Sequence, residues 1–269
     1  MMQGTHTSQG AEATSMAAEN PALNQDAFAR GIAQATATES TGMTVAGTYA
    51  ITAVLVLLLV VAGAFGWSQV QIEVIQGQEV ALTPRWIWLA FLLTFILAMV
   101  GAFAFRAAPL IAPLYALCEG VLLGIVSRYY ELDFDGVVAQ AVLATLGIFV
   151  MMLLLYATRI VKVTSKLVLG VAAAMGGLAI MWMTAWLLSL FGVNLAFLYA
   201  PTPLGIALSI GIVILGALSL LVDFDFIERM AASGAPGYMA WYAGFGLMLA
   251  IIWIYLSVLR VLALLRRAQ

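Results

Sequence analysis

Seven apolar segments alternate with shorter polar ones along this chain. Each is about 17 to 25 residues long, which is enough for a helix to cross the hydrocarbon core of a bilayer. Trp67, Trp86 and Trp88 flank the first two segments, where interfacial aromatic residues are expected. The pattern predicts membrane-spanning helices at residues 48–67, 86–105, 114–130, 137–157, 167–191, 204–227 and 241–265.

A polar segment precedes the first apolar one. Residues 1–46 are rich in Ala, Thr, Ser, Gly and Gln and show little hydrophobic periodicity. Such a segment cannot bury enough apolar surface to fold by itself. No signal peptide is expected, because the first apolar segment starts far from the N-terminus and no basic residues precede it near the start of the chain. We therefore expect two regions, a disordered tail at 1–46 and a seven-helix transmembrane domain at 47–269.

The connections between the spans differ in character. Residues 68–84 are expected to form a polar loop, and residues 108–113 a short link between the second and third spans. The loop at 192–203 carries no charge, which leaves a re-entrant or interfacial path open.

The distribution of Lys and Arg favours a cytoplasmic N-terminal tail, because short cytoplasmic loops are enriched in both residues. Arg266 and Arg267 at the C-terminus count against this orientation. With the tail inside, the cytoplasmic loops hold Arg106, Arg159, Lys162, Lys166 and Arg229.

The composition is that of a membrane protein. Of the 269 residues, 64% are hydrophobic and 9% are charged, and the mean hydropathy is +1.08. A soluble globular domain has a far larger charged fraction. The formal net charge is −2 without a large basic cluster, which argues against a nucleic-acid-binding protein. Cys118 is the one cysteine and His6 the one histidine, so an internal disulfide and a Cys/His metal site are excluded.

One carboxylate is expected inside the third span. Glu119 stands near its middle, and an intramembrane charge is costly unless it is paired, hydrated or neutralised. Gly120 and Gly124 follow with the small-xxx-small spacing that lets two helix backbones approach closely. Glu119 therefore either lines a narrow polar site beside a close helix contact or simply bonds a neighbouring hydroxyl group.

The sixth span ends in three acidic residues. Asp223 and Asp225 point about 200° apart on a helix with ~3.6 residues per turn, so only one of them faces the bundle interior. Ser219 shares the face of Asp223, which makes Asp223 the interior candidate. Asp225 and Glu228 are expected to meet water near Arg229. The alternative is that all three acids merely cap the end of the span.

Arg106 ends the second span. If the tail is cytoplasmic, the second and sixth spans end on the same side, which puts Arg106 at the depth of Asp223. An ion pair between these two residues is one option. The other is that Arg106 extends to the lipid headgroups.

Enzymatic chemistry is not expected. The chain has no phosphate-binding loop and no membrane histidine to activate a Ser or Cys nucleophile. Asp223 and Asp225 are too close on one helix to form an aspartic-protease dyad. We accordingly expect no catalytic residue and no cofactor.

Several segments carry a resemblance to a known family. They are Pro113–Gly124 (PLYALCEGVLLG), Gln140–Gly147 (QAVLATLG) and Asp223–Glu228 (DFDFIE), with Tyr238 and Trp241–Ala243 (WYA) downstream. Through them the chain from about Met43 onward resembles the bacterial Bax inhibitor-1 (YccA-like) family. The resemblance implies an all-α membrane fold, with two groups of three helices around the seventh, and a pH-sensitive calcium leak.

The resemblance also implies roles for single residues. In the family, an Asp on the sixth helix pairs with an acid on the seventh, and an Arg on the second helix binds the freed carboxylate. Asp223 matches the first of these, and Arg106 is the candidate for the Arg. Residues 237–269, however, contain no Asp or Glu. Either Glu119 or Asp225 substitutes for the missing acid, or Asp223 acts alone with Arg106, or the channel activity does not extend to this chain.

Two functional hypotheses follow. The first is a pH-regulated cation leak in the cell membrane, with Ca²⁺ or protons as partners; Asp223, Glu119 and Asp225 serve the ion path and pH sensing, and Arg106 is an electrostatic gate. A small number of carboxylates favours the passage of a cation over its tight binding. We therefore expect no resident metal ion. The second is a non-transporting membrane regulator that binds membrane proteases or stress-response proteins.

Overall fold

The computed structural model describes residues 42–75, 78–192 and 200–268. Most of the predicted tail and most of the loop at 192–203 lie outside the described residues. Residues 43–269 form one compact unit. The division into a tail at 1–46 and a domain at 47–269 stays a prediction.

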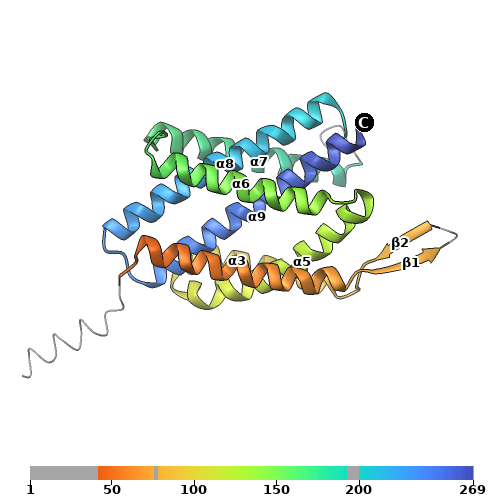
Figure 1. Cartoon of the computed structure of the whole chain (residues 1–269), viewed down its shortest axis with the longest axis horizontal. Helices are drawn as coiled ribbons and strands as arrows, with labels where there is room; N and C mark the ends of the chain where they lie inside the picture. The colour runs from red at the N-terminus through yellow and green to blue at the C-terminus, as the bar shows by residue number, and fades with distance from the viewer. Residues whose placement is uncertain (1–41, 76–77, 193–199, 269) are drawn as a thin grey trace, which may run out of the picture. The chain divides into compact units, whose positions relative to one another are not determined.

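Seven helices of 17 to 30 residues dominate the described part of the chain (Figure 1). Six of them are long and apolar enough to cross a membrane, and α4 is shorter. The predicted all-α polytopic membrane fold is confirmed. The helices are α3 (Val45–Ser68), α4 (Ile87–Phe103), α5 (Ala108–Asp133), α6 (Val137–Ala157), α7 (Ser165–Leu190), α8 (Pro203–Ala232) and α9 (Tyr238–Arg267).

Helix α9 is central to the unit. It packs against α3, α5, α6 and α8, and in Figure 1 it runs between the two groups of helices. In one group α3 and α4 pack on α5, and in the other α6 and α7 pack on α8. Ala240, Ala243 and Gly244 of α9 are buried, and their small size lets neighbouring helices approach. The expected arrangement of two three-helix groups around the seventh helix is therefore confirmed.

The closest backbone contact joins α3 and α5. A Cβ atom on Gly124 would lie 1.9 Å from the carbonyl oxygen of Gly63, and one on Gly66 would lie 2.1 Å from that of Val121. A Cβ atom on Gly120 would lie 2.3 Å from the carbonyl oxygen of Leu59. The small-xxx-small spacing in the third span thus marks a real helix contact.

Two connections differ from the prediction. Residues 68–84 contain an antiparallel hairpin, β1 (Gln71–Ile75) and β2 (Gln78–Leu82), rather than a plain polar loop. The polar and apolar residues of β1 alternate with the period of a strand, and a search for apolar spans does not test that period. Residues 108–113 open α5 instead of forming a link, because Pro109 is tolerated in the first helical turn.

Candidate functional site

Asp223 faces a cavity of about 280 Å³ between α4, α8 and α9. Its side chain is partly buried, and no described residue forms an ion pair or hydrogen bond with its carboxylate. The other residues around the cavity are mostly small or aromatic: Ala98, Ala102, Phe226, Tyr242, Ala243, Phe245, Gly246 and Leu249.

The cavity exists because two helices present small residues opposite Asp223. Ala98 and Ala102 are four residues apart and share one face of α4. Ala243 and Gly246 are three apart and share one face of α9. Tyr242 is the other titratable residue in the lining. Helix α9 contributes no acid to the cavity. Asp223 therefore faces a cavity between helices, and its role in an ion path stays a prediction.

Arg106 is exposed and lies in a 3₁₀ turn, η2 (Phe105–Ala107), that follows α4. Its neighbour Phe105 packs edge-on against Tyr242, with 6.0 Å between the ring centroids. Since Tyr242 lines the cavity of Asp223, Arg106 lies at the same end of the unit as that cavity. No ion pair between Arg106 and Asp223 is formed among the described residues.

The other two acids of α8 have cationic partners. Asp225 forms an ion pair of 2.6 Å with Arg229, one turn later on the same helix. Glu228 instead turns toward α6, where it pairs with Arg159 at 2.5 Å and accepts a hydrogen bond from the Tyr156 hydroxyl. The three acids thus occupy three different environments, and only Asp223 faces the cavity.

Sequence reasoning missed the partners of Glu228. It placed this carboxylate in water near Arg229, whereas the contacts come from the end of α6. Tyr156 is 8% exposed, so its hydroxyl needs a partner within the protein. The available signal was topological: the fourth and sixth spans end on the same side, which brings the basic loop after α6 to the acidic end of α8.

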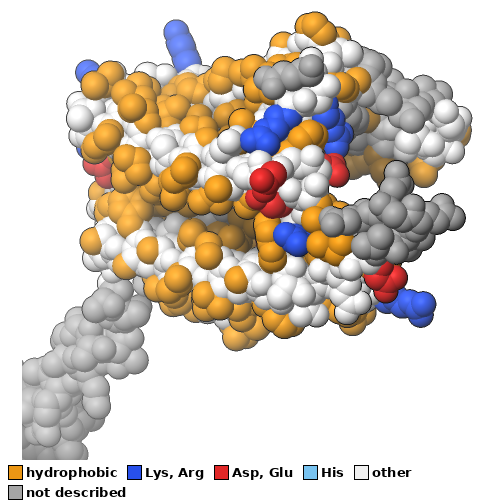
Figure 2. All heavy atoms as spheres, turned by 45° about the vertical axis from the view of Figure 1, so that its right-hand side comes forward, with side chains coloured by type: hydrophobic (Ala, Val, Ile, Leu, Met, Phe, Trp, Pro, Cys, Tyr) orange, Lys and Arg blue, Asp and Glu red, His pale blue; other side chains and the backbone are white. Residues whose placement is uncertain are grey.

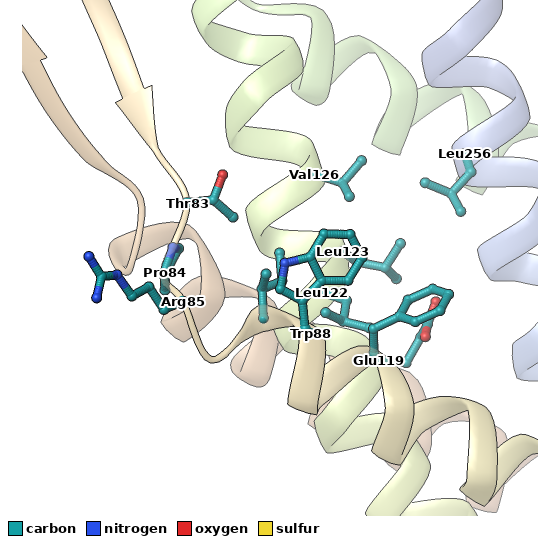
Figure 3. A pocket seen from close by; sticks show the side chains of 11 residues that line it. Thr83, Pro84, Arg85, Trp88, Glu119, Leu122, Leu123, Val126 and Leu256 are labelled. Carbon is teal, nitrogen blue, oxygen red and sulfur yellow. The ribbon is translucent and has the colours of Figure 1, made fainter.

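Glu119 faces a different cavity, with a volume of about 550 Å³ (Figure 3). Arg85 contributes to its wall but extends away from Glu119. No described residue forms an ion pair with the Glu119 carboxylate. The remaining lining comes from the segment before α4 and from α4, α5 and α9: Thr83, Pro84, Ile87, Trp88, Phe91, Leu122, Leu123, Val126 and Leu256. Glu119 and Asp223 are therefore not brought into one cavity.

Both cavities lie along one face of α4. Phe91 lines the Glu119 cavity and Ala98 lines the Asp223 cavity, and Thr94 lies between them at helical spacing. Thr94 is 5% exposed, and its hydroxyl group has no hydrogen-bond partner among the described residues. An unsatisfied buried polar group is uncommon and calls for an explanation. The Thr94 hydroxyl is thus a polar group on α4 between the residues that line the two carboxylate cavities.

Two aromatic rings pack against each other near the interval between the two cavities. Tyr115 lies one turn before Glu119 on α5, and Phe245 belongs to the wall of the Asp223 cavity. Their ring centroids are 5.1 Å apart in an edge-to-face arrangement, and both side chains are buried. Because α5 starts at the end of the unit that holds Asp223, Tyr115 lies on the Asp223 side of Glu119. We call these two residues the ring pair.

Comparison with known proteins supports the membrane assignment. A family model described as Bax inhibitor 1 like matches residues 20–267. The match covers all seven helices and begins within the polar tail. No curated protein and no solved structure matches the chain.

Proposed function

This chain belongs to the Bax inhibitor 1 like family and is a multi-pass membrane protein, and from this premise we propose that it is a pH-regulated leak for cations, Ca²⁺ in particular. The observation that carries the proposal is Asp223, a carboxylate that faces a cavity between three helices without a described ion-pair partner. Ionisable residues inside a membrane domain typically belong to ion or proton pathways. The proposed location is the cell membrane, with the tail in the cytoplasm.

The proposed path follows one face of α4. It runs from the Glu119 cavity past Thr94 to the Asp223 cavity. Carboxylate and hydroxyl oxygens are ligands that suit a hard cation such as Ca²⁺. A single carboxylate in each cavity favours passage over tight binding. The Tyr115 hydroxyl interacts with the Glu119 carboxylate, while its ring packs against Phe245. We propose that the ring pair is the constriction of this path and holds back ions by excluding water when the path is closed.

Asp223 is the proposed pH sensor. Among the residues around its cavity, α4 contributes only alanines and α9 contributes Tyr242 as the one titratable group. Protonation of Asp223 removes the negative charge that attracts a cation, so we expect the flux to fall as the pH decreases. Arg106 is the proposed electrostatic gate, because it lies at the same end of the unit. Asp225, the third acid predicted for the ion path, forms an ion pair with Arg229 and does not line the Asp223 cavity.

Ca²⁺ flux into proteoliposomes tests the proposal. Asp223→Asn and Glu119→Gln preserve side-chain size and remove the charge. We expect each to reduce the flux about tenfold or more, because the loss of one favourable charge interaction at low dielectric exceeds ~1.4 kcal/mol. Asp223→Asn should also abolish the pH dependence. The measurement is the rate of Ca²⁺-dye fluorescence at acidic, neutral and alkaline pH.

The matched control for this experiment is Asp135→Asn. Asp135 is exposed, lines neither carboxylate cavity and has no ion pair among the described residues. Its substitution should leave both the flux and its pH dependence unchanged. Equal flux in the wild type and all three variants would discard the leak.

A second function is favoured by the missing acid on α9. Residues 237–269 contain no Asp or Glu, and Tyr242 is the titratable residue that α9 places beside Asp223. A non-transporting regulator that binds membrane proteases or stress-response proteins does not need that acid. In this case deletion of residues 1–42 abolishes rescue of a deletion strain under membrane stress, while Asp223→Asn rescues fully. The leak predicts that Asp223→Asn fails to rescue.

A further inference from the structure

A third cavity lies between the two groups of helices. It has a volume of about 510 Å³ and is bounded by α3, α5, α6 and α9. Figure 2 shows a hollow lined by hydrophobic side chains on this side of the molecule. Except for Ser127, Thr145 and Tyr255, its walls consist of aliphatic residues, glycines and Trp67. It shares neither Glu119 nor Asp223 with the proposed ion path.

The cavity opens sideways toward the bilayer. Val60 of α3 and Leu146 of α6 line it from opposite walls, and their side chains are 58% and 52% exposed. Apolar side chains that are exposed on a membrane-spanning helix contact lipid. A molecule from the hydrocarbon region can therefore enter between α3 and α6.

A positively charged side chain, Arg128, lies at one end of this cavity. The guanidinium carbon of Arg128 lies 5.1 Å from the centroid of the Trp67 ring, which lines the cavity. Arg128 forms no ion pair with a described carboxylate. Ser127 and Tyr255, which also line the cavity, are joined by a hydrogen bond of 2.6 Å. Trp and Arg are typical of the headgroup level of a membrane protein.

The acids that follow Arg128 at the end of α5 have other partners. The carboxylate of Glu131 accepts hydrogen bonds of 2.8 and 3.0 Å from the backbone N–H groups of Gly136 and Val138. Asp133 forms an ion pair of 3.1 Å with Arg267. No described carboxylate forms an ion pair with Arg128, so its positive charge can attract an anion from outside the chain.

We propose that this cavity is a binding site for a phospholipid, with one acyl chain between α3 and α6 and the phosphate bound by Arg128. The volume of about 510 Å³ falls within the range of ~300–1,000 Å³ that is typical of ligand pockets. Arginine binds phosphate with two parallel hydrogen bonds, and basic sites between membrane helices recognise lipid headgroups. A free phosphate ion fits the guanidinium but has no apolar part for the walls.

Native mass spectrometry of the purified protein with phosphatidylglycerol tests this site. The wild type should retain one lipid per chain. Leu146→Trp fills the opening and should abolish retention, as should Val60→Trp from the opposite wall. The matched control is Leu143→Trp on the same helix, where the side chain is 70% exposed and outside the cavity lining. Circular dichroism confirms that each variant is folded.

The charge is tested separately. Arg128→Gln should weaken phosphatidylglycerol binding about tenfold or more, since it removes a charge-assisted hydrogen bond. Lys166→Gln, at an exposed lysine outside the cavity lining, should leave binding unchanged. Diacylglycerol and inorganic phosphate, each added alone, should bind far more weakly than the lipid. Full retention in both tryptophan variants, full affinity in Arg128→Gln, or equal binding of either probe would overturn the proposal.

Discussion

Gly124→Ala is expected to destabilise the protein by about 3 kcal/mol or more, at or beyond the upper end of what overpacking of a well-packed interior costs. The added methyl group would lie 1.9 Å from the carbonyl oxygen of Gly63, far inside contact distance. That oxygen belongs to the backbone and cannot rotate away, so α3 must move from α5. The movement also loosens the contacts of Gly66 and Gly120 in the same interface.

The folded fraction in a denaturing-detergent titration, followed by circular dichroism, measures this loss. Gly147→Ala on α6 is the matched control, because nothing lies within 4 Å of the position of its added Cβ atom. We expect that control to be as stable as the wild type. Equal destabilisation by both substitutions would show that the α3–α5 contact is looser than described.

Phe245→Ala is expected to raise the Ca²⁺ leak about tenfold or more, a change that requires a barrier only ~1.4 kcal/mol lower. Phe245 is 3% exposed and forms the ring pair with Tyr115 between the two carboxylate cavities. Removing one ring opens space between Glu119 and Asp223, which lets water and a cation pass. Tyr115→Leu should raise the leak as well, because it removes the other ring.

Stability must be separated from gating in this experiment. Phe245→Ala also creates a cavity in the core, which typically costs ~3–5 kcal/mol. Phe149→Ala is the control: the Phe149 ring packs 5.7 Å from that of Phe224 in a different cluster, away from the proposed path. It should lower stability without raising the leak. A leak raised equally by both substitutions would mean that the loosened protein, rather than the ring pair, controls flux.

The spans could be predicted because their signal is local. Long apolar runs, tryptophans at their ends and few charges identify membrane helices one segment at a time. The same local rules identified the glycine spacing on α5 and the inward face of Asp223 on α8, since residues three or four apart share a helix face. The hairpin β1–β2 was missed because its strand alternation is short and stands between two much stronger apolar signals.

Partners could not be predicted, because they depend on how each helix is rotated against helices that are distant in the sequence. Glu228 pairs with Arg159 and Tyr156 across two helices, while Asp223, five residues earlier, has no described partner. Glu119 and Asp223 looked like members of one site, yet they face separate cavities with the ring pair between them.

Residue order alone thus determined the class of protein and the approximate positions of its apolar helices, because helical periodicity and hydropathy act within a single segment. Only the packing of α4, α5, α8 and α9 decided which carboxylates face cavities, which are paired and what separates them. Such contacts are set by the shapes of surfaces that meet only after all the helices have assembled.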